Sequence, residues 1–231
     1  MDGRAQTKGV NGDKPFWNQG CTTTFAVGNV RANSQDDDLT KTPHPEIDAF
    51  STIPDTWIGA HKTAFASAFY GGISLENDAA KREAGILMYK FENGENSTFS
   101  FSASSNMSRL LSSDPAFLVI AQRFEKAAKE FYGSYHTLDG FDGQQLLGRP
   151  YIKDTWFMHT VLGGTQQFDA TITKVTANEI LVRYSVWDHF GAGTNDATSK
   201  LPGLPSMYIL QRVPGRKYVP FIWGINVNRK Q

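Results

Sequence analysis

A strictly alternating stretch at residues 180–188 constrains the fold of this chain more than any other feature. Successive side chains of a β-strand point to opposite faces, so Ile180, Val182, Tyr184 and Val186 would share one apolar face. Asp188 follows at the same parity. Burying a carboxylate costs several kcal/mol or more unless the charge is paired or binds a metal. We therefore expect Asp188, at the mouth of a core, to have a partner or a chemical role.

The composition supports a β-rich protein with some helix. The 231 residues are 40% hydrophobic and 13% aromatic, with 21 Gly and 10 Pro, which suits strands joined by tight turns. Lys and Arg total 23 and Asp and Glu total 23, so no overall field attracts a polyanion, and nucleic acid is not the favoured partner. Cys21 is the single cysteine, and no Cys/His spacing resembles a zinc site.

The N-terminal residues predict neither a signal peptide nor a compact unit. They lack an apolar segment of signal-peptide type, and no window approaches the roughly 18 apolar residues of a membrane span. We therefore expect a protein made in the cytoplasm without a cleavable signal and exported by a dedicated machine, to act in the envelope of a target cell. Residues 1–47 are poor in aliphatic side chains and rich in Gly, Asn, Thr and Asp, which predicts an extended arm or linker.

Residues 48–147 predict a mainly helical part. Strong helix formers at residues 75–84 indicate a helix between residues 73 and 91. The clearest helix starts at Asp114 and Pro115, a capping side chain followed by proline in the first turn. Its apolar residues repeat at a spacing of three and four up to Phe131, and Gly133 follows as a stop.

Residues 148–231 predict an antiparallel β domain. Candidate strands lie at residues 154–162, 167–175, 180–188, 207–213 and 217–227. Short turns at residues 176–179 and at Pro214-Gly215 imply hairpins. The expected fold class is α+β: an N-terminal arm and helices packed on a C-terminal antiparallel, strongly twisted sheet or small open β-barrel.

The segment after the alternating strand is the first candidate site. It begins at Asp188-His189-Phe190-Gly191 and runs through Gly-, Asn- and Pro-rich sequence to Pro205, which is longer than a hairpin needs. Asp188 and Asp196 flank His189. If the segment folds back, the two carboxylates could share Mg²⁺, with His189 as general acid or base. The alternative is that Asp188 caps backbone N–H groups and His189 only packs.

Other candidate residues surround this segment in the sequence. Asp154 and His159 lie in the first predicted strand, on opposite faces, and Asp154 would join the site if the two strands align. A guanidinium, from Arg183 or Arg212, could bind a phosphate through two N–H groups. Trp187 precedes the acid as a supporting residue.

The C-terminal residues resemble a known group of domains. The resemblance rests on the following segments: Asp154-Thr155-Trp156, residues 184–191 with Asp196, residues 208–212 and residues 218–222. They are similar to an uncharacterised family of proteobacterial domains attached to, or encoded beside, secreted polymorphic-toxin and contractile-secretion proteins. The match covers about residues 148–227. The family's acidic and aliphatic residues after the glycine are replaced here by residues 192–195.

A more distant likeness is to the catalytic domain of colicin M. That likeness implies cleavage of the lipid-linked peptidoglycan precursor at its pyrophosphate, with Mg²⁺. Trp187-Asp188 stands where that family has Tyr-Asp, but Ser185 replaces its first Asp, and no His-Arg pair follows.

These resemblances give the leading hypothesis, an antibacterial effector or toxin domain that hydrolyses a phosphate-containing envelope substrate. Its partners would be that lipid-linked substrate and a cognate immunity protein. The catalytic residues would be Asp188, His189 and Asp154. The supporting or substrate-binding residues would be Asp196, Arg212, Arg183, His159 and Trp187, and Asp188 and Asp196 would hold the metal. The alternatives are a non-enzymatic binding or structural module of a phage or secretion apparatus, and a nuclease toxin, which would require a basic cleft.

Overall fold

The computed structural model describes residues 6–8, 22–28, 55–72, 78–148, 161–162, 165–176, 178–200, 203–213 and 218–231. The helices are α3 (Asp55–Gly72), α4 (Asp78–Asn93), α5 (Asn106–Ser113), α6 (Pro115–Tyr135) and α8 (Leu204–Arg212), with 3-10 turns η3 (Gly143–Leu146) and η4 (Thr194–Thr198). The strands are β1 (Gln6–Lys8), β2 (Thr22–Gly28), β3 (Phe99–Phe101), β4 (Gln167–Val175), β5 (Ile180–Phe190) and β6 (Phe221–Lys230).

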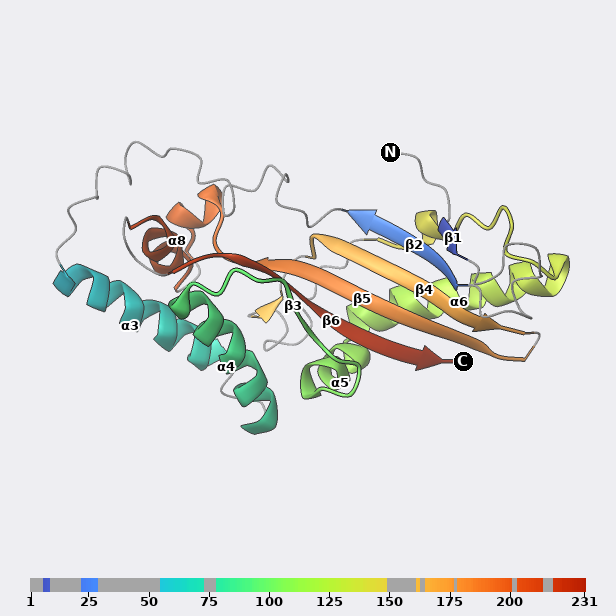
Figure 1. The fold of residues 1–231 in the computed structure, drawn as a ribbon, viewed down its shortest axis with the longest axis horizontal. Coiled ribbons are helices and arrows are strands. Elements are labelled where there is room, and N and C mark those ends of the chain that lie inside the picture. Colours follow the sequence, from blue (N-terminus) through green and yellow to red (C-terminus); the bar gives the residue numbers. More distant parts are fainter. Residues whose placement is uncertain are drawn as a thin grey trace.

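The described strands form one open, twisted sheet in the order β1-β2-β4-β5-β6-β3 (Figure 1). This confirms the α+β class. The sheet does not close into a barrel, and it is mixed, because β3 pairs parallel with β6 while the other pairs are antiparallel. The predicted hairpin between β4 and β5 is present, and the Thr176 N–H donates to the Glu179 carbonyl at 2.8 Å across its turn.

The alternation that predicted β5 decides which face of the sheet is buried. Ile180, Val182, Tyr184 and Val186 are at most 2% exposed. The two cross-strand neighbours of Tyr184, Ala170 on β4 and Val227 on β6, are also buried. We call this the inner face, and the face that carries the other parity, with Ser185 and Trp187, the outer face. β5 continues two residues past the predicted end, to Phe190.

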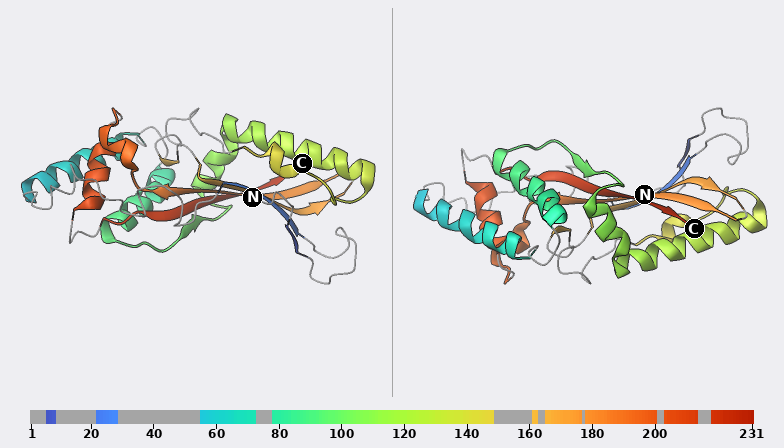
Figure 2. Two further views of the ribbon diagram at one scale, coloured as in Figure 1. Left: turned by 90° about the horizontal axis from the view of Figure 1, so that it is seen from above. Right: turned by 90° about the horizontal axis from the view of Figure 1, so that it is seen from below.

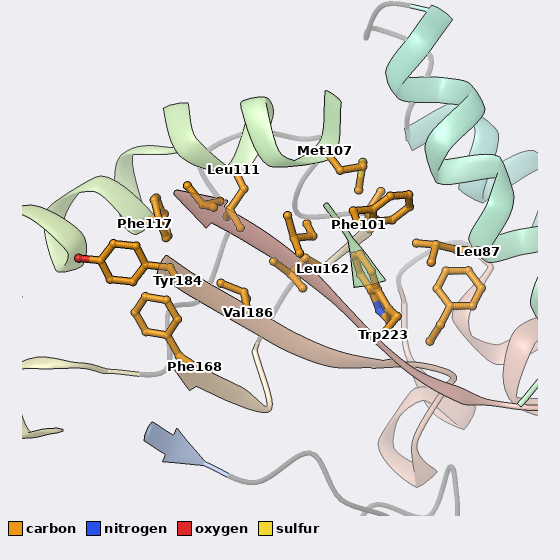
Figure 3. Close-up of a cluster of buried hydrophobic side chains, with 14 of the residues drawn as sticks. Leu87, Phe101, Met107, Leu111, Phe117, Leu162, Phe168, Tyr184, Val186 and Trp223 are labelled. Atoms are coloured by element: carbon orange, nitrogen blue, oxygen red, sulfur yellow. The ribbon is translucent and has the colours of Figure 1, made fainter. Parts of the chain in front are cut away.

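Helix α6 runs along the inner face (Figure 2). It begins as predicted: Asp114 accepts hydrogen bonds from the N–H groups of Ala116 and Phe117, and Pro115 occupies the first turn. Its Phe117 ring meets Tyr184 edge to face, at 5.4 Å between ring centres. Figure 3 shows the resulting core, in which Met107 and Leu111 of α5 continue the same layer toward Phe101 and Trp223.

A polar network lies inside this core. Glu125 of α6 is 1% exposed, and its carboxylate accepts hydrogen bonds from the Tyr184 hydroxyl and from the Arg229 guanidinium of β6. Because these bonds pair the buried charge, Glu125 does not carry the cost of an unpaired carboxylate.

The region predicted as an arm contributes two strands of the sheet, β1 and β2. Residues 22–28 form β2, which pairs with β4 from Thr23 opposite Ile172 to Gly28 opposite Gln167. Phe25 is 2% exposed and contacts Phe124 and Phe141 edge to face. Three successive threonines and an aromatic residue suit a pleated, half-buried strand, so the scarcity of aliphatic residues did not prevent one.

Two predicted strands differ from the structure. Residues 207–213 were expected to be a strand, but they belong largely to helix α8, where Met207, Tyr208, Leu210 and Gln211 are buried. That spacing is a helical stripe, and Pro205 stands in the first turn, where it suits a helix. The strand predicted at residues 154–162 falls outside the described residues except for Val161 and Leu162, which are not part of a strand. The turn at Pro214-Gly215 also lies outside them.

Candidate functional site

The end of β5 buries two adjacent titratable side chains. Asp188 is 9% exposed and His189 is 7% exposed. Their cross-strand neighbours on β6 are Trp223 and Ile222. Asp188 continues the inner-face parity of β5, as predicted, and the strand leaves the sheet two residues later.

Phe190 fixes this end of the strand against the helices. Its ring lies 5.6 Å from that of Phe69 on α3 and 5.8 Å from that of Phe91 on α4. A third ring, Phe221 of β6, lies at 5.6 Å. The aromatic cluster therefore packs Phe190, the residue that follows Asp188 and His189, against α3 and α4.

Helix α8 fixes the segment that follows. The Ala192 N–H donates to the Gln211 side-chain oxygen at 3.0 Å, and the Gln211 amide donates back to the Ala192 carbonyl. Ala192 and Gln211 are both buried. These two bonds satisfy the peptide groups of a segment that has left the sheet.

Asp196 has a structural partner of its own. Its carboxylate accepts a hydrogen bond from the Gly193 N–H at 2.9 Å at the start of η4. Burial raises the pKa of Asp196 above its ordinary value, and the Gly193 hydrogen bond opposes that rise. Asp196 thus takes the capping role that the sequence offered as the alternative for Asp188.

The predicted basic residues lie in different environments. Arg212 ends α8, and its guanidinium carbon lies 4.6 Å from the centre of the buried Tyr208 ring, a cation–π contact. Arg183 is exposed on the outer face of β5. Trp187 also lies on the outer face, so both diverge from Asp188, which is on the inner face.

The described residues do not assemble a metal centre. No group of three or more His, Cys, Asp and Glu side chains gathers in a metal-binding arrangement within the part of the chain that the structure describes. Asp154 and His159 lie outside that part. Asp188 and Asp196 thus remain two candidate ligands with no third from the described residues.

A histidine-serine pair near this segment was not predicted. His61 Nδ1 of α3 lies 3.1 Å from the Ser206 hydroxyl of α8, although 145 residues separate them. Burial lowers the pKa of His61, which favours the neutral ring. A β-carbon on Gly203 would come within 2.6 Å of Ala68, so a glycine is needed where α8 begins against α3. No local motif around either partner could have indicated the pair.

A second unpredicted cluster lies on the outer face. Burial raises the pKa of Asp169 on β4, while hydrogen bonds from the Gln167 and Trp187 side chains act in the opposite direction. Asp169 and Trp187 are brought together by the pairing of β4 with β5. Strand alternation alone gave their faces but not this register.

Comparison of the chain with family models, with curated proteins and with solved structures found no match. Among the described helices, none combines the length and the apolar character that crossing a bilayer requires.

Proposed function

We propose that the chain is an antibacterial effector domain that hydrolyses a phosphate-containing cell-envelope substrate, the lipid-linked peptidoglycan precursor, at the end of β5. One observation carries the proposal: Asp188 and His189, which lie on opposite faces of β5, are both buried, at 9% and 7% exposure, where the strand leaves the sheet. Burying a carboxylate is costly unless it has a partner or a chemical role, which is why Asp188 is the starting point of the proposal. The resemblance of residues 148–227 to toxin-associated domains suggests the effector role, and the more distant likeness to the catalytic domain of colicin M supplies the substrate class.

Each residue has a role in this proposal. Asp188 activates the water that attacks the phosphorus, the bond from that phosphorus to the lipid oxygen breaks, and His189 gives its proton to this leaving oxygen. Arg212 on α8 contacts the phosphate. Mg²⁺ is the proposed cofactor, held by Asp188 and Asp196 with Asp154 as a supporting acid, and it would neutralise charge on the phosphoryl oxygens. The described residues alone do not complete that ligand set.

Expression in a test bacterium is the first experiment. The protein is directed either to the periplasm or to the cytoplasm, alongside the variants Asp188→Asn and His189→Gln. Glu130→Gln is the matched control, because Glu130 is exposed on α6. We expect growth arrest from the periplasmic protein, relief in both site variants, and no relief in the control. Absence of toxicity in both compartments, or full toxicity of Asp188→Asn, would contradict the proposal.

An assay of the purified protein tests the reaction itself. Cleavage of a lipid-linked precursor is measured as the release of its pyrophosphate-bearing product, once with Mg²⁺ and once with a chelator. The proposal expects product with Mg²⁺ and none from Asp188→Asn. The effector hypothesis also expects a cognate immunity protein that binds the chain and blocks this cleavage.

A non-enzymatic module is the second candidate. The observation that favours it is the use of Asp196 and Gln211 to satisfy backbone groups, since such bonds fix a loop without chemistry. On this hypothesis the chain is part of a phage or secretion apparatus, and the site variants leave its function unchanged. A nuclease toxin is the third candidate, which degradation of DNA or RNA by the purified protein would support.

A further inference from the structure

The outer face of the sheet carries a row of polar side chains around one indole ring. Its members come from three neighbouring strands: Gln167, Asp169 and Thr171 of β4, Arg183, Ser185 and Trp187 of β5, and Asn226 of β6. In Figure 1, α6 lies behind β4 and β5, so this face is turned toward the viewer.

Trp187 is held against the strands by a glycine. Gly224 is its cross-strand neighbour on β6, and a β-carbon there would come within 2.5 Å of the six-membered part of the indole. The ring therefore lies over the bare backbone of Gly224. Trp187 is only partly exposed, so one side of the indole packs on the sheet and part of it stays accessible.

The indole is also fixed at its polar edge. Its N–H donates to the Asp169 carboxylate. Gln167 donates from its side-chain amide to both oxygens of the same carboxylate, at 2.8 Å each. Asp169 is partly exposed, so its carboxylate can accept further hydrogen bonds from a ligand.

Further polar groups continue the row. The Ser185 hydroxyl donates to the Asn226 side-chain oxygen at 2.7 Å, and the Asn226 amide donates to the Phe101 carbonyl at 3.1 Å. Ser185 lies opposite Asp169 in the register of β4 with β5. The polar groups beside the ring are thus preorganised by bonds within the protein.

We propose that this face is a saccharide-binding site. An indole supplies a flat apolar surface for the C–H side of a sugar ring, while a carboxylate, an amide and a hydroxyl at its edge bind sugar hydroxyl groups. The Asp169 charge disfavours a phosphate or nucleic-acid strand stacked on the same ring. The site faces away from Asp188, and its function does not depend on the hydrolase proposed above.

Titration calorimetry with the full chain tests the proposal. The probes are a β-1,4-linked N-acetylglucosamine trimer, a β-1,4-linked glucose trimer and purified peptidoglycan sacculi in a pull-down. We expect at least one of them to bind, and Trp187→Ala to weaken that binding by about tenfold or more, as removal of a central aromatic contact does. Trp187→Phe, which keeps a ring but loses the N–H, should lie between the two.

A matched control tests whether losing a tryptophan outside the proposed site also changes binding. Trp57 is 57% exposed on α3, so Trp57→Ala should leave saccharide binding unchanged. Asp169→Asn should weaken binding while urea denaturation verifies that the fold persists. The proposal is overturned if no saccharide probe binds at millimolar concentration or if Trp187→Ala binds as the parent does. Binding of choline or single-stranded DNA alone, lost in Trp187→Ala, would also overturn it.

Discussion

The Glu125 carboxylate pairs with the Arg229 guanidinium through both of its oxygens, with Nε to Oε1 at 2.7 Å and Nη2 to Oε2 at 3.2 Å. The pair ties α6 to β6 across 104 residues of sequence. Tyr184, between them on β5, donates its hydroxyl to the same carboxylate at 3.0 Å. Three elements of the core therefore share one charged acceptor.

Glu125→Gln should destabilise the protein. The change keeps the size of the side chain but leaves the Arg229 charge without its opposing carboxylate, which we expect to lower the free energy of unfolding by roughly 2 to 3 kcal/mol. Urea denaturation measures the loss. Glu130→Gln on the same helix is the control, since its ion pair with Lys126 is exposed and should contribute less than about 0.5 kcal/mol. Equal effects of the two changes would contradict the assigned role of Glu125.

Gly224→Ala should destabilise the protein and displace Trp187. The added β-carbon would lie 2.5 Å from the indole and 2.8 Å from the Val186 carbonyl, and a backbone oxygen cannot move aside easily. We expect a loss of roughly 1 to 3 kcal/mol and a changed tryptophan emission spectrum. Gly133→Ala is the opposite case, because nothing lies within 4 Å of its added carbon in α6. It should stabilise by about 0.5 kcal/mol.

The pH dependence of stability should contain a contribution from His61. Burial lowers the folded-state pKa of His61 below its ordinary value of 6.5, so the unfolded chain binds this proton more readily. Its contribution is therefore present above about pH 6.5 and is lost as the pH falls through the folded pKa. His61→Asn removes this contribution while keeping an acceptor for Ser206. Unfolding between pH 8 and pH 5, with an NMR titration of His61, checks the prediction, and identical pH profiles of parent and variant would refute it.

Gln211→Ala should loosen the segment after β5. The change removes the partner of both the Ala192 N–H and the Ala192 carbonyl, which are buried. Buried peptide groups without partners are costly, and we expect a loss of roughly 2 kcal/mol with faster hydrogen exchange at residues 191–193. Gln122→Ala on the exposed face of α6 should change neither quantity. Unaltered exchange in Gln211→Ala would show that the bonds do not hold the segment.

Phe25→Ala tests the place of β2 in the core. Phe25 is 2% exposed and packs on Phe124 and Phe141, so its truncation should cost about 3 to 5 kcal/mol. Val119→Ala, at a position 64% exposed on α6, should change the free energy of unfolding by less than about 0.5 kcal/mol. A Phe25→Ala protein as stable as the parent would place β2 outside the cooperative unit.

The predictions from sequence succeeded where a local signal was strong. The parity of residues 180–188 placed Tyr184 and Val186 in the core, and Asp114 with Pro115 marked the start of α6, because alternation and capping are properties of a few adjacent residues. The short apolar run at residues 207–213 fits both a strand and a helix. Contact with α3 at Gly203 accompanies the helix here, and that contact has no local signature.

Only part of the candidate site could be predicted from sequence, because contacts between distant residues have no local signature. Trp187 and Asp188 are adjacent in the motif and were grouped together, yet strand geometry sends them to opposite faces. The partner of Trp187 is Asp169, which the β4–β5 register supplies, and Ser206 meets His61 through the packing of α8 on α3. The residues that flank each member of these pairs in the sequence do not indicate its distant partner, so roles that depend on the pairs could not be predicted.

The position of β2 has a consequence for the folding pathway. Thr23 pairs with Ile172, so β2 finds its neighbour β4 only after some 150 further residues have been synthesised. Contacts of such high sequence separation slow folding, because a long loop must close before they form. The β4–β5 hairpin can assemble early by comparison, with the flank that β2 will cover still open. Until β2 docks, that open strand can recruit another chain, so this is the stage at which we expect the protein to be most prone to aggregation.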